Sequence, residues 1–158
     1  MSLRILIVLI LTLILSACNL PPLLQPDVSV EQLWIKEAKV SEITAGDLNQ
    51  SCICERMSTT NAYLQINNTG WAADRLTSVE TDVAVRVDFH QTGVAESLTS
   101  PVILDSVEIP AHGQANFAQG SYAMVLKDLK KDLKPGDQVQ LSLKFENSGT
   151  VMLTAEVR

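Results

Sequence analysis

Apolar side chains recur at every second position along most of the chain, which is typical of β-strands with one buried face. The period is unbroken from Val139 to Phe145 and again from Val151 to Val157. The intervening residues 147–149 (Asn-Ser-Gly) predict a tight turn, so we expect these two runs to form a β-hairpin. Further runs predict strands with these inward-facing residues: Val28 and Val30; Ala62, Leu64 and Ile66; Val83, Val85, Val87 and Phe89; Ile103, Val107 and Ile109.

No segment shows a long apolar period of 3.6 residues, the period of an amphipathic helix. Residues 126–133 could form one helical turn at most, and their charged side chains, Lys127 and Asp128 among them, predict a solvated loop. Seven or eight short strands separated by turns indicate an all-β domain, a Greek-key β-sandwich or barrel.

The first residues do not belong to this domain. Arg4 precedes an almost unbroken apolar run from Ile5 to Leu15, which is too short to span a bilayer stably. Residues 15–18 (Leu-Ser-Ala-Cys) resemble the lipobox of bacterial lipoproteins, which implies a signal peptide over residues 1–17 and lipidation of Cys18. An uncleaved anchor and a plain secretory signal are the alternatives. We expect a proline-containing tether over residues 18–27 and a domain over residues 28–158, anchored by lipid outside the cytoplasm, in the periplasm or on the outer surface.

The charge of the chain excludes one class of partner. Its formal net charge is −6 and becomes one unit more negative when Arg4 leaves with the signal peptide. An acidic domain does not attract nucleic acid or anionic lipid. We therefore expect no nucleic-acid partner, and a membrane contact only through the lipidated N-terminus.

Nine motifs follow one another along most of the expected domain. They are residues 30–34 (VEQLW), 62–68 (AYLQINN), 73–76 (ADRL), 87–90 (VDFH), 109–113 (IPAHG), 120–122 (GSY), 126–133 (LKDLKKDL), 134–139 (KPGDQV) and 143–145 (LKF). In this order they resemble the motifs of the PCu(A)C family of periplasmic copper chaperones. This resemblance implies a cupredoxin-like fold that binds Cu(I) and a copper-accepting partner, such as a cytochrome c oxidase subunit or an assembly factor.

The resemblance also implies a metal site that this chain does not keep intact. The family uses a His, a Met about eleven residues later and a His-x-Met pair, a ligand set suited to Cu(I). The first His corresponds to His90, but residues 91–122 contain no methionine. Ala123 and Val125 stand at the His and Met of the pair. Met124 lies between them, and on a strand it should point to the opposite face, into the core.

An insertion over residues 39–60 offers substitutes, because it contains Cys52-Ile53-Cys54 and Met57. Soft thiolates favour Cu(I). We therefore predict a relocated copper(I) site made of His90, Cys52, Cys54 and Met57, which requires the insertion to reach His90. His112, in a predicted turn, is a further candidate.

Other interpretations stay open. Cys52 and Cys54 could form a disulfide, although a disulfide between residues i and i+2 is geometrically awkward, or could exchange disulfides with a partner. The domain could also be a degenerate family member that no longer binds metal and serves as a protein-interaction module. Local motifs indicate no catalytic triad, so we do not expect an enzyme. We interpret Asp74 and Arg75 as an ion pair in a turn, and Trp71 as either an exposed contact or a cap over the end of the sheet.

Overall fold

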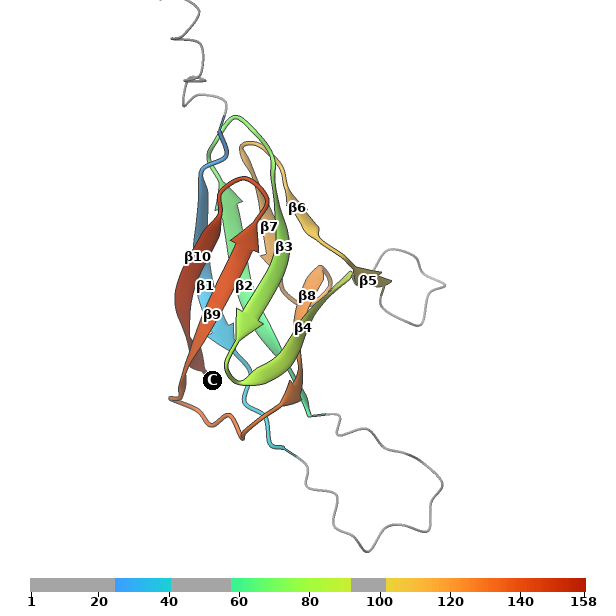
Figure 1. Ribbon diagram of the computed structural model, residues 1–158, viewed down its shortest axis with the longest axis vertical. Helices are drawn as coiled ribbons and strands as arrows, with labels where there is room; N and C mark the ends of the chain where they lie inside the picture. Colours follow the sequence, from blue (N-terminus) through green and yellow to red (C-terminus); the bar gives the residue numbers. More distant parts are fainter. Residues whose placement is uncertain (1–24, 41–57, 92–101) are drawn as a thin grey trace, which may run out of the picture.

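The computed structural model describes residues 25–40, 58–91 and 102–158. This part of the chain is all-β and contains ten strands in one sheet (Figure 1). The strands are β1 (Val28–Ile35), β2 (Thr59–Asn68), β3 (Asp74–Thr81), β4 (Ala84–Gln91), β5 (Val102–Leu104), β6 (Val107–Ile109), β7 (Gly113–Phe117), β8 (Tyr122–Leu129), β9 (Gln138–Phe145) and β10 (Thr150–Val157). The all-β prediction is confirmed. The described residues form ten strands where seven or eight were expected, and the run predicted over Ile103, Val107 and Ile109 is divided between the two short strands β5 and β6.

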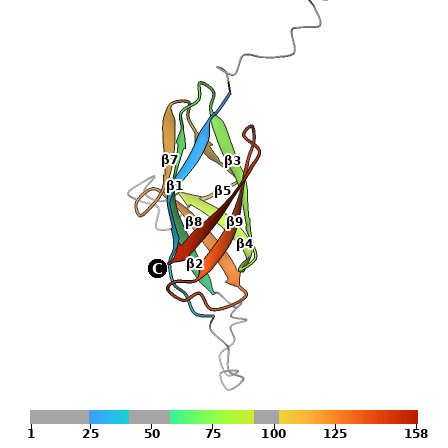
Figure 2. The ribbon, with the colours of Figure 1, turned by 90° about the vertical axis from the view of Figure 1, so that its left-hand side faces the viewer.

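The sheet has the strand order β5-β4-β8-β7-β2-β1-β10-β9-β3-β6, and β2 also pairs with β8. It curls on itself, so that β9, β10 and β3 face β2, β7 and β8 (Figures 1 and 2). The first strand, β1, pairs in parallel with the last strand, β10. The apolar face of the sheet lies inside the curl and forms one core, which includes Ile66, Leu76, Phe117, Met124, Leu141 and Leu143.

The predicted hairpin is confirmed. Leu141 pairs with Leu153 in the β9–β10 ladder, and the chain reverses through residues 146–149. Gly149 has a φ of 76°, a left-handed conformation that glycine adopts without steric strain. The strict alternation of β9 fixes its register, because a shift by one residue would expose its whole apolar face.

The alternation expected for β4 fails near its start. Val83 and Ala84 are both buried, whereas Val85 is 67% exposed. Asp82 and Val83 form the β3–β4 turn, which interrupts the alternation, and Asp128 of the neighbouring strand has a left-handed φ of 56° opposite this point. Ile103 was likewise expected to face inward, but it is 64% exposed on the edge strand β5.

The prediction of a loop over residues 126–133 is also wrong in its first half. Strand β8 continues to Leu129 and pairs with β4 along its whole length. Leu126 and Leu129 are buried in the core. Lys127 lies on the opposite face of the strand from Leu126, and Asp128, with its left-handed φ of 56°, interrupts the alternation so that Leu129 returns to the core.

The fold has two distinct ends. The tether end consists of residues 25–27, 69–73, 110–112 and 146–149, at the top of Figure 1. The distal end consists of residues 36–40, the β3–β4 turn, residues 130–137 and the C-terminus. In the part of the chain that the structure describes, no helix is long and apolar enough to cross a bilayer.

Candidate metal site and tether-end cleft

His90 lies near the end of β4, between two neighbouring strands. It pairs with Ala123 of β8 on one side and with Ile103 of β5 on the other. The side chain is half-buried, and its Nε2 atom is buried without a hydrogen-bond partner among the described residues. A buried imidazole nitrogen with an unused lone pair or proton is a group that a ligand could satisfy.

The surroundings of His90 favour the neutral imidazole. Burial lowers its pKa from the ordinary 6.5, and the nearby positive charge of Lys127 lowers it further, while Asp88 acts in the opposite direction. The net effect is a lowered pKa, so His90 is neutral at pH 7. Neutral imidazole is the form that binds metal ions.

Lys127, whose charge acts on the pKa of His90, is held by a cluster of ion pairs on the outer face of β4 and β8. Its Nζ atom lies 2.6 Å from Oδ2 of Asp88, and both side chains are about four-fifths buried, with 21% and 22% exposed. Arg86 extends the cluster, with Nε at 3.9 Å from Oδ2 of both Asp88 and Asp128. This arrangement fixes the positive charge that, after burial, is the second cause of the lowered pKa of His90.

The positions at which the resembling family carries further ligands hold none here. Ala123, directly opposite His90, and Val125 have no metal-binding group. Met124 is fully buried and pairs with Phe89, as predicted for a core residue. Among the described residues, no three His, Cys, Asp or Glu side chains are grouped so that they could hold a metal ion.

The insertion joins the described domain at Val40 and Ser58. The N–H of Leu129 donates to the carbonyl oxygen of Ser58, and Thr59 pairs with Lys127, so this junction lies beside the C-terminal half of β8. From Lys127 to Ala123, the partner of His90, β8 runs for four residues, or about 13 Å at 3.3 Å per residue. Cys52, Cys54 and Met57 lie outside the described residues, so the predicted copper site, His90 included, stays a prediction.

His112 lies elsewhere in the fold. It occupies the turn between β6 and β7 at the tether end, with a left-handed φ of 51°. Its ring meets the ring of Trp71 edge-on, with 4.4 Å between centroids. Trp71 is 66% exposed and does not cover the apolar core. The structure thus favours the interpretation of Trp71 as an exposed contact.

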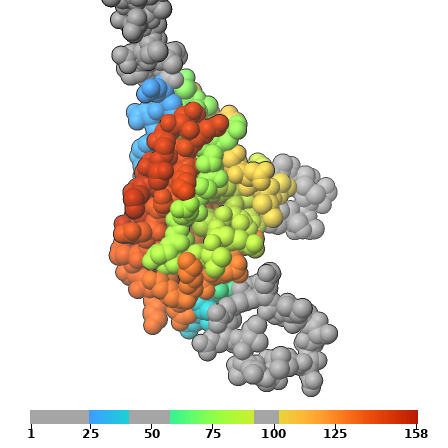
Figure 3. Space-filling view, viewed as in Figure 1, coloured from blue at the N-terminus to red at the C-terminus, as the bar shows by residue number. Residues whose placement is uncertain are grey.

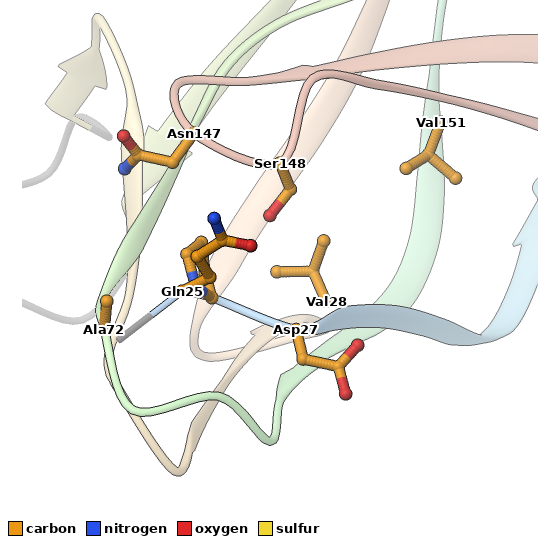
Figure 4. Close-up of a pocket in the computed structure, with 8 residues that line it drawn as sticks. Gln25, Asp27, Val28, Ala72, Asn147, Ser148 and Val151 are labelled. Carbon is orange, nitrogen blue, oxygen red and sulfur yellow. The ribbon is translucent and has the colours of Figure 1, made fainter. Parts of the chain in front are cut away.

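A cleft of about 670 Å³ opens at the same end (Figure 4). The start of β1 and the β9–β10 turn form its two sides, and Gln25 and Ser148 point into the space between them. It is lined by Gln25, Pro26, Asp27, Val28, Ala72, Asn147, Ser148 and Val151. The lining offers amide and hydroxyl groups but no histidine, cysteine or methionine, so it lacks the soft ligands that Cu(I) requires.

Asp74 supports the floor of this region, and the predicted ion pair with Arg75 is wrong. The carboxylate of Asp74 is buried and accepts hydrogen bonds from the backbone N–H groups of Arg75, Asn147 and Ser148 at 2.7, 2.9 and 2.9 Å. Burial raises the pKa of Asp74, but these bonds and the Ser148 side chain outweigh it, so the pKa is lowered from 3.8. The guanidinium of Arg75 instead pairs with Glu146 at 3.8 Å.

Comparisons with known proteins agree with the resemblance. The copper-bound PCuAC domain from PmoF2 has a TM-score of 0.61 and 21% identity over 83% of this chain and 92% of its own. The apo PCuAC domain from PmoF1 has a TM-score of 0.57 and 24% identity, again over 83% of this chain and 92% of its own. The solution structure of CuI-DR1885 from Deinococcus radiodurans has a TM-score of 0.56 and 20% identity, over 90% of this chain and 82% of its own. These likenesses confirm the PCuAC-type, cupredoxin-like fold.

No curated protein sequence matches the chain. The sequence model of one family, whose description reads "Putative lipoprotein LpqE-like", matches residues 28–157, nearly the whole expected domain. The chain therefore belongs to the LpqE-like family and has the fold of PCuAC copper-chaperone domains.

Proposed function

We propose that this protein is a lipid-anchored, extracytoplasmic copper(I)-binding protein that passes its metal to an acceptor. The observation that carries the proposal is His90: a neutral, half-buried imidazole with an unpartnered Nε2, at the position of the family's first ligand. Two of the similar structures, the PCuAC domain from PmoF2 and CuI-DR1885, are copper-bound, which supports copper as the metal. The lipobox-like residues 15–18 and the description of the family support the anchor.

The proposed site combines His90 with the thiolates of Cys52 and Cys54. Two thiolates and one neutral imidazole form a soft ligand set that prefers Cu(I). Met57 is the weaker member, because it directly precedes Ser58 at the junction with the domain and has less reach than the two cysteines. Binding would release protons from the thiols, so affinity should rise with pH.

Transfer would proceed by ligand exchange and needs no change in oxidation state. A thiol or imidazole of the acceptor replaces one ligand at a time, while the remaining ligands keep hold of the ion. The resemblance points to an oxidase subunit or an assembly factor as the acceptor. The roles of the chain's own residues are to present His90 unprotonated and to supply the thiolates.

One observation favours a second function. Ala123 and Val125 stand where the family carries its His-x-Met pair, and the described residues contain no complete metal site. A member that has lost its metal would serve as a protein-interaction module, and the cysteines could then form a disulfide or exchange one with a partner.

A competition titration distinguishes the two functions. The reduced, soluble chain from residue 19 onward is titrated with Cu(I) against a chromogenic chelator. We expect one equivalent to bind, weaker binding in His90→Ala and loss of binding in Cys52→Ser/Cys54→Ser. His112→Ala is the matched control, because His112 lies at the tether end, and it should bind as the parent does. No binding by the reduced parent chain would contradict the copper function and favour the interaction module.

A further inference from the structure

We propose that the tether end of the domain faces the bilayer, with Trp71 seated at the level of the lipid headgroups. Trp71 is 66% exposed, and its ring lies edge-on against His112, which holds it at the surface of the turn. Tryptophan combines a large apolar ring with an N–H donor, and it is enriched where a protein meets the membrane–water interface. The inference rests on the proposed lipid anchor.

Hydrogen bonds fix the start of β1 next to the loop that carries Trp71. The backbone N–H of Asp27 donates to Oδ1 of Asn68 at 3.0 Å, and the Thr69 hydroxyl donates to the Asp27 carboxylate at 2.8 Å. The Thr69 N–H also donates to the Asp27 carbonyl oxygen at 2.9 Å. Trp71 is therefore held close to the point at which the tether leaves the domain.

The contact at Gly70 leaves no room between these two segments. A methyl group on Gly70 would lie 2.5 Å from the backbone nitrogen of Asp27, which is closer than a carbon atom can approach. The backbone of the loop thus rests directly on the tether residues. Because Trp71 follows Gly70, the backbone at Trp71 cannot move away from the tether without breaking this packing.

The length of the tether limits how far this end can lie from the membrane. Gln25 is the seventh residue after the proposed lipidated Cys18, so a fully extended chain between them spans at most about 25 Å. The distal end is farther from the anchor by the length of β1, whose eight residues add about 26 Å. The tether end thus reaches the bilayer more readily than any other surface of the described domain (Figures 1 and 3).

Charge specifies the kind of bilayer. The tether end carries exposed carboxylates on Asp27 and Glu146 and no lysine or arginine side chain. This excess of negative charge repels anionic lipids, so the surface fits headgroups without net charge, such as phosphatidylcholine. The contact then comes from the indole rather than from basic side chains.

The chain contains a second tryptophan that serves as an internal control. Trp34 lies near the distal end of β1 and stacks on Tyr63, with 4.2 Å between ring centroids and 12° between planes. Trp34→Phe keeps an aromatic ring in this stack and leaves Trp71 as the sole indole, while Trp71→Phe leaves Trp34 alone.

The test uses the full lipidated chain on phosphatidylcholine vesicles whose acyl chains are brominated close to the headgroup. We expect these lipids to remove roughly half of the Trp71 emission in Trp34→Phe, as for an indole at the interface, and to leave the Trp34 emission in Trp71→Phe unchanged. Co-sedimentation with the vesicles reports the anchor separately.

Three results would overturn the inference. Co-sedimentation without quenching of Trp71 would leave the anchor intact and exclude the membrane contact. Failure of the lipidated chain to co-sediment would overturn the anchor and the contact together. A blue shift of Trp71 emission that grows with protein concentration in the absence of vesicles would assign this surface to a second copy of the chain.

Discussion

His90 and Ala123 face each other across the antiparallel ladder of β4 and β8. Directly opposed residues in such a ladder have Cβ atoms about 5 Å apart, a separation that lets two imidazoles bind one metal ion. Because the resemblance places a histidine at position 123, the pair shows where the family site is incomplete in this chain. A single change at position 123 would place a second imidazole opposite His90.

Ala123→His should restore a metal-binding pair without the insertion. In the Cys52→Ser/Cys54→Ser background, we expect it to strengthen Cu(I) binding at least about tenfold, or about 1.4 kcal/mol. Adding His90→Ala to this variant should abolish the gain. Chelator competition measures both. An Ala123→His variant that binds no better than its background would show that the two positions do not face a common site.

Lys127→Met should raise the pKa of His90. The substitution removes a positive charge that disfavours the imidazolium and leaves the Asp88 carboxylate, which favours it, with a weaker ion-pair partner. An NMR titration of the His90 ring protons gives the midpoint of its protonation, which reports its pKa. Arg75→Met, at the other end of the sheet, is the control and should leave it unchanged. A midpoint that stays the same in Lys127→Met would mean that Lys127 does not set the protonation state of His90.

The lowered pKa of His90 also predicts how stability changes with acid. Between the unfolded value of 6.5 and the lower folded value, the unfolded chain binds more protons, so the free energy of unfolding falls as the pH drops through this window. His90→Gln should remove this part of the dependence. Urea denaturation at several pH values from 7.5 to below the folded midpoint measures it. If the free energy of unfolding of His90→Gln changed with pH between these limits as it does in the parent chain, the claim that His90 is buried as a neutral imidazole would be wrong.

Asp74→Asn should destabilise the domain by about 2 kcal/mol, because one of its three backbone donors then meets an amide N–H instead of a carboxylate oxygen. The folded pKa lies below 3.8, so the stabilisation by the carboxylate is present above that value and is lost as the pH falls through the folded pKa. Urea denaturation at neutral and acid pH measures both the loss of stability in the variant and its dependence on pH. Asp82→Asn, at an exposed turn residue, is the control, and an equal effect in the two variants would contradict the role of Asp74.

Gly70→Ala should loosen the start of β1. The added methyl group overlaps the backbone of residues 25–27, and overpacking of this kind costs about 1–3 kcal/mol. We expect limited proteolysis to cut the variant near Pro26 faster than the parent chain. Gly120→Ala is the comparison, because a methyl group there meets nothing within 4 Å, although its φ of 82° also disfavours alanine. Equal cleavage near Pro26 in both variants would contradict the packing of Gly70 on the tether residues.

The sequence predicted the parts of the fold that local alternation determines. Residues 139–145 have one buried face and a glycine-containing turn after them, so only one strand register buries their apolar side chains. The predicted ion pair between Asp74 and Arg75 is wrong because successive side chains on a strand point to opposite faces, so neighbours in sequence do not pair there. Val85 and Ile103 were misassigned because their exposure depends on a turn and on an edge position that the apolar pattern does not reveal.

The surroundings of the candidate site were predictable only in part. The motif over residues 87–90 identified His90, and the position of Met124 between Ala123 and Val125 indicated a core residue. The ion pair of Lys127 with Asp88 joins residues that are far apart in sequence and become neighbours only when β4 pairs with β8. Burial lowers the pKa of His90 most and the charge of Lys127 lowers it further, and both arise only when the strands pair, so no local motif could have indicated the lowered pKa.

The central claim is that His90 and the two thiolates bind one Cu(I) ion together. X-ray absorption at the copper edge tests it most directly, on the reduced chain loaded with one equivalent of Cu(I). We expect a coordination shell of sulfur with one imidazole nitrogen, and loss of the imidazole contribution in His90→Ala but not in His112→Ala. A shell of sulfur alone, identical in the parent chain and in His90→Ala, would contradict the account.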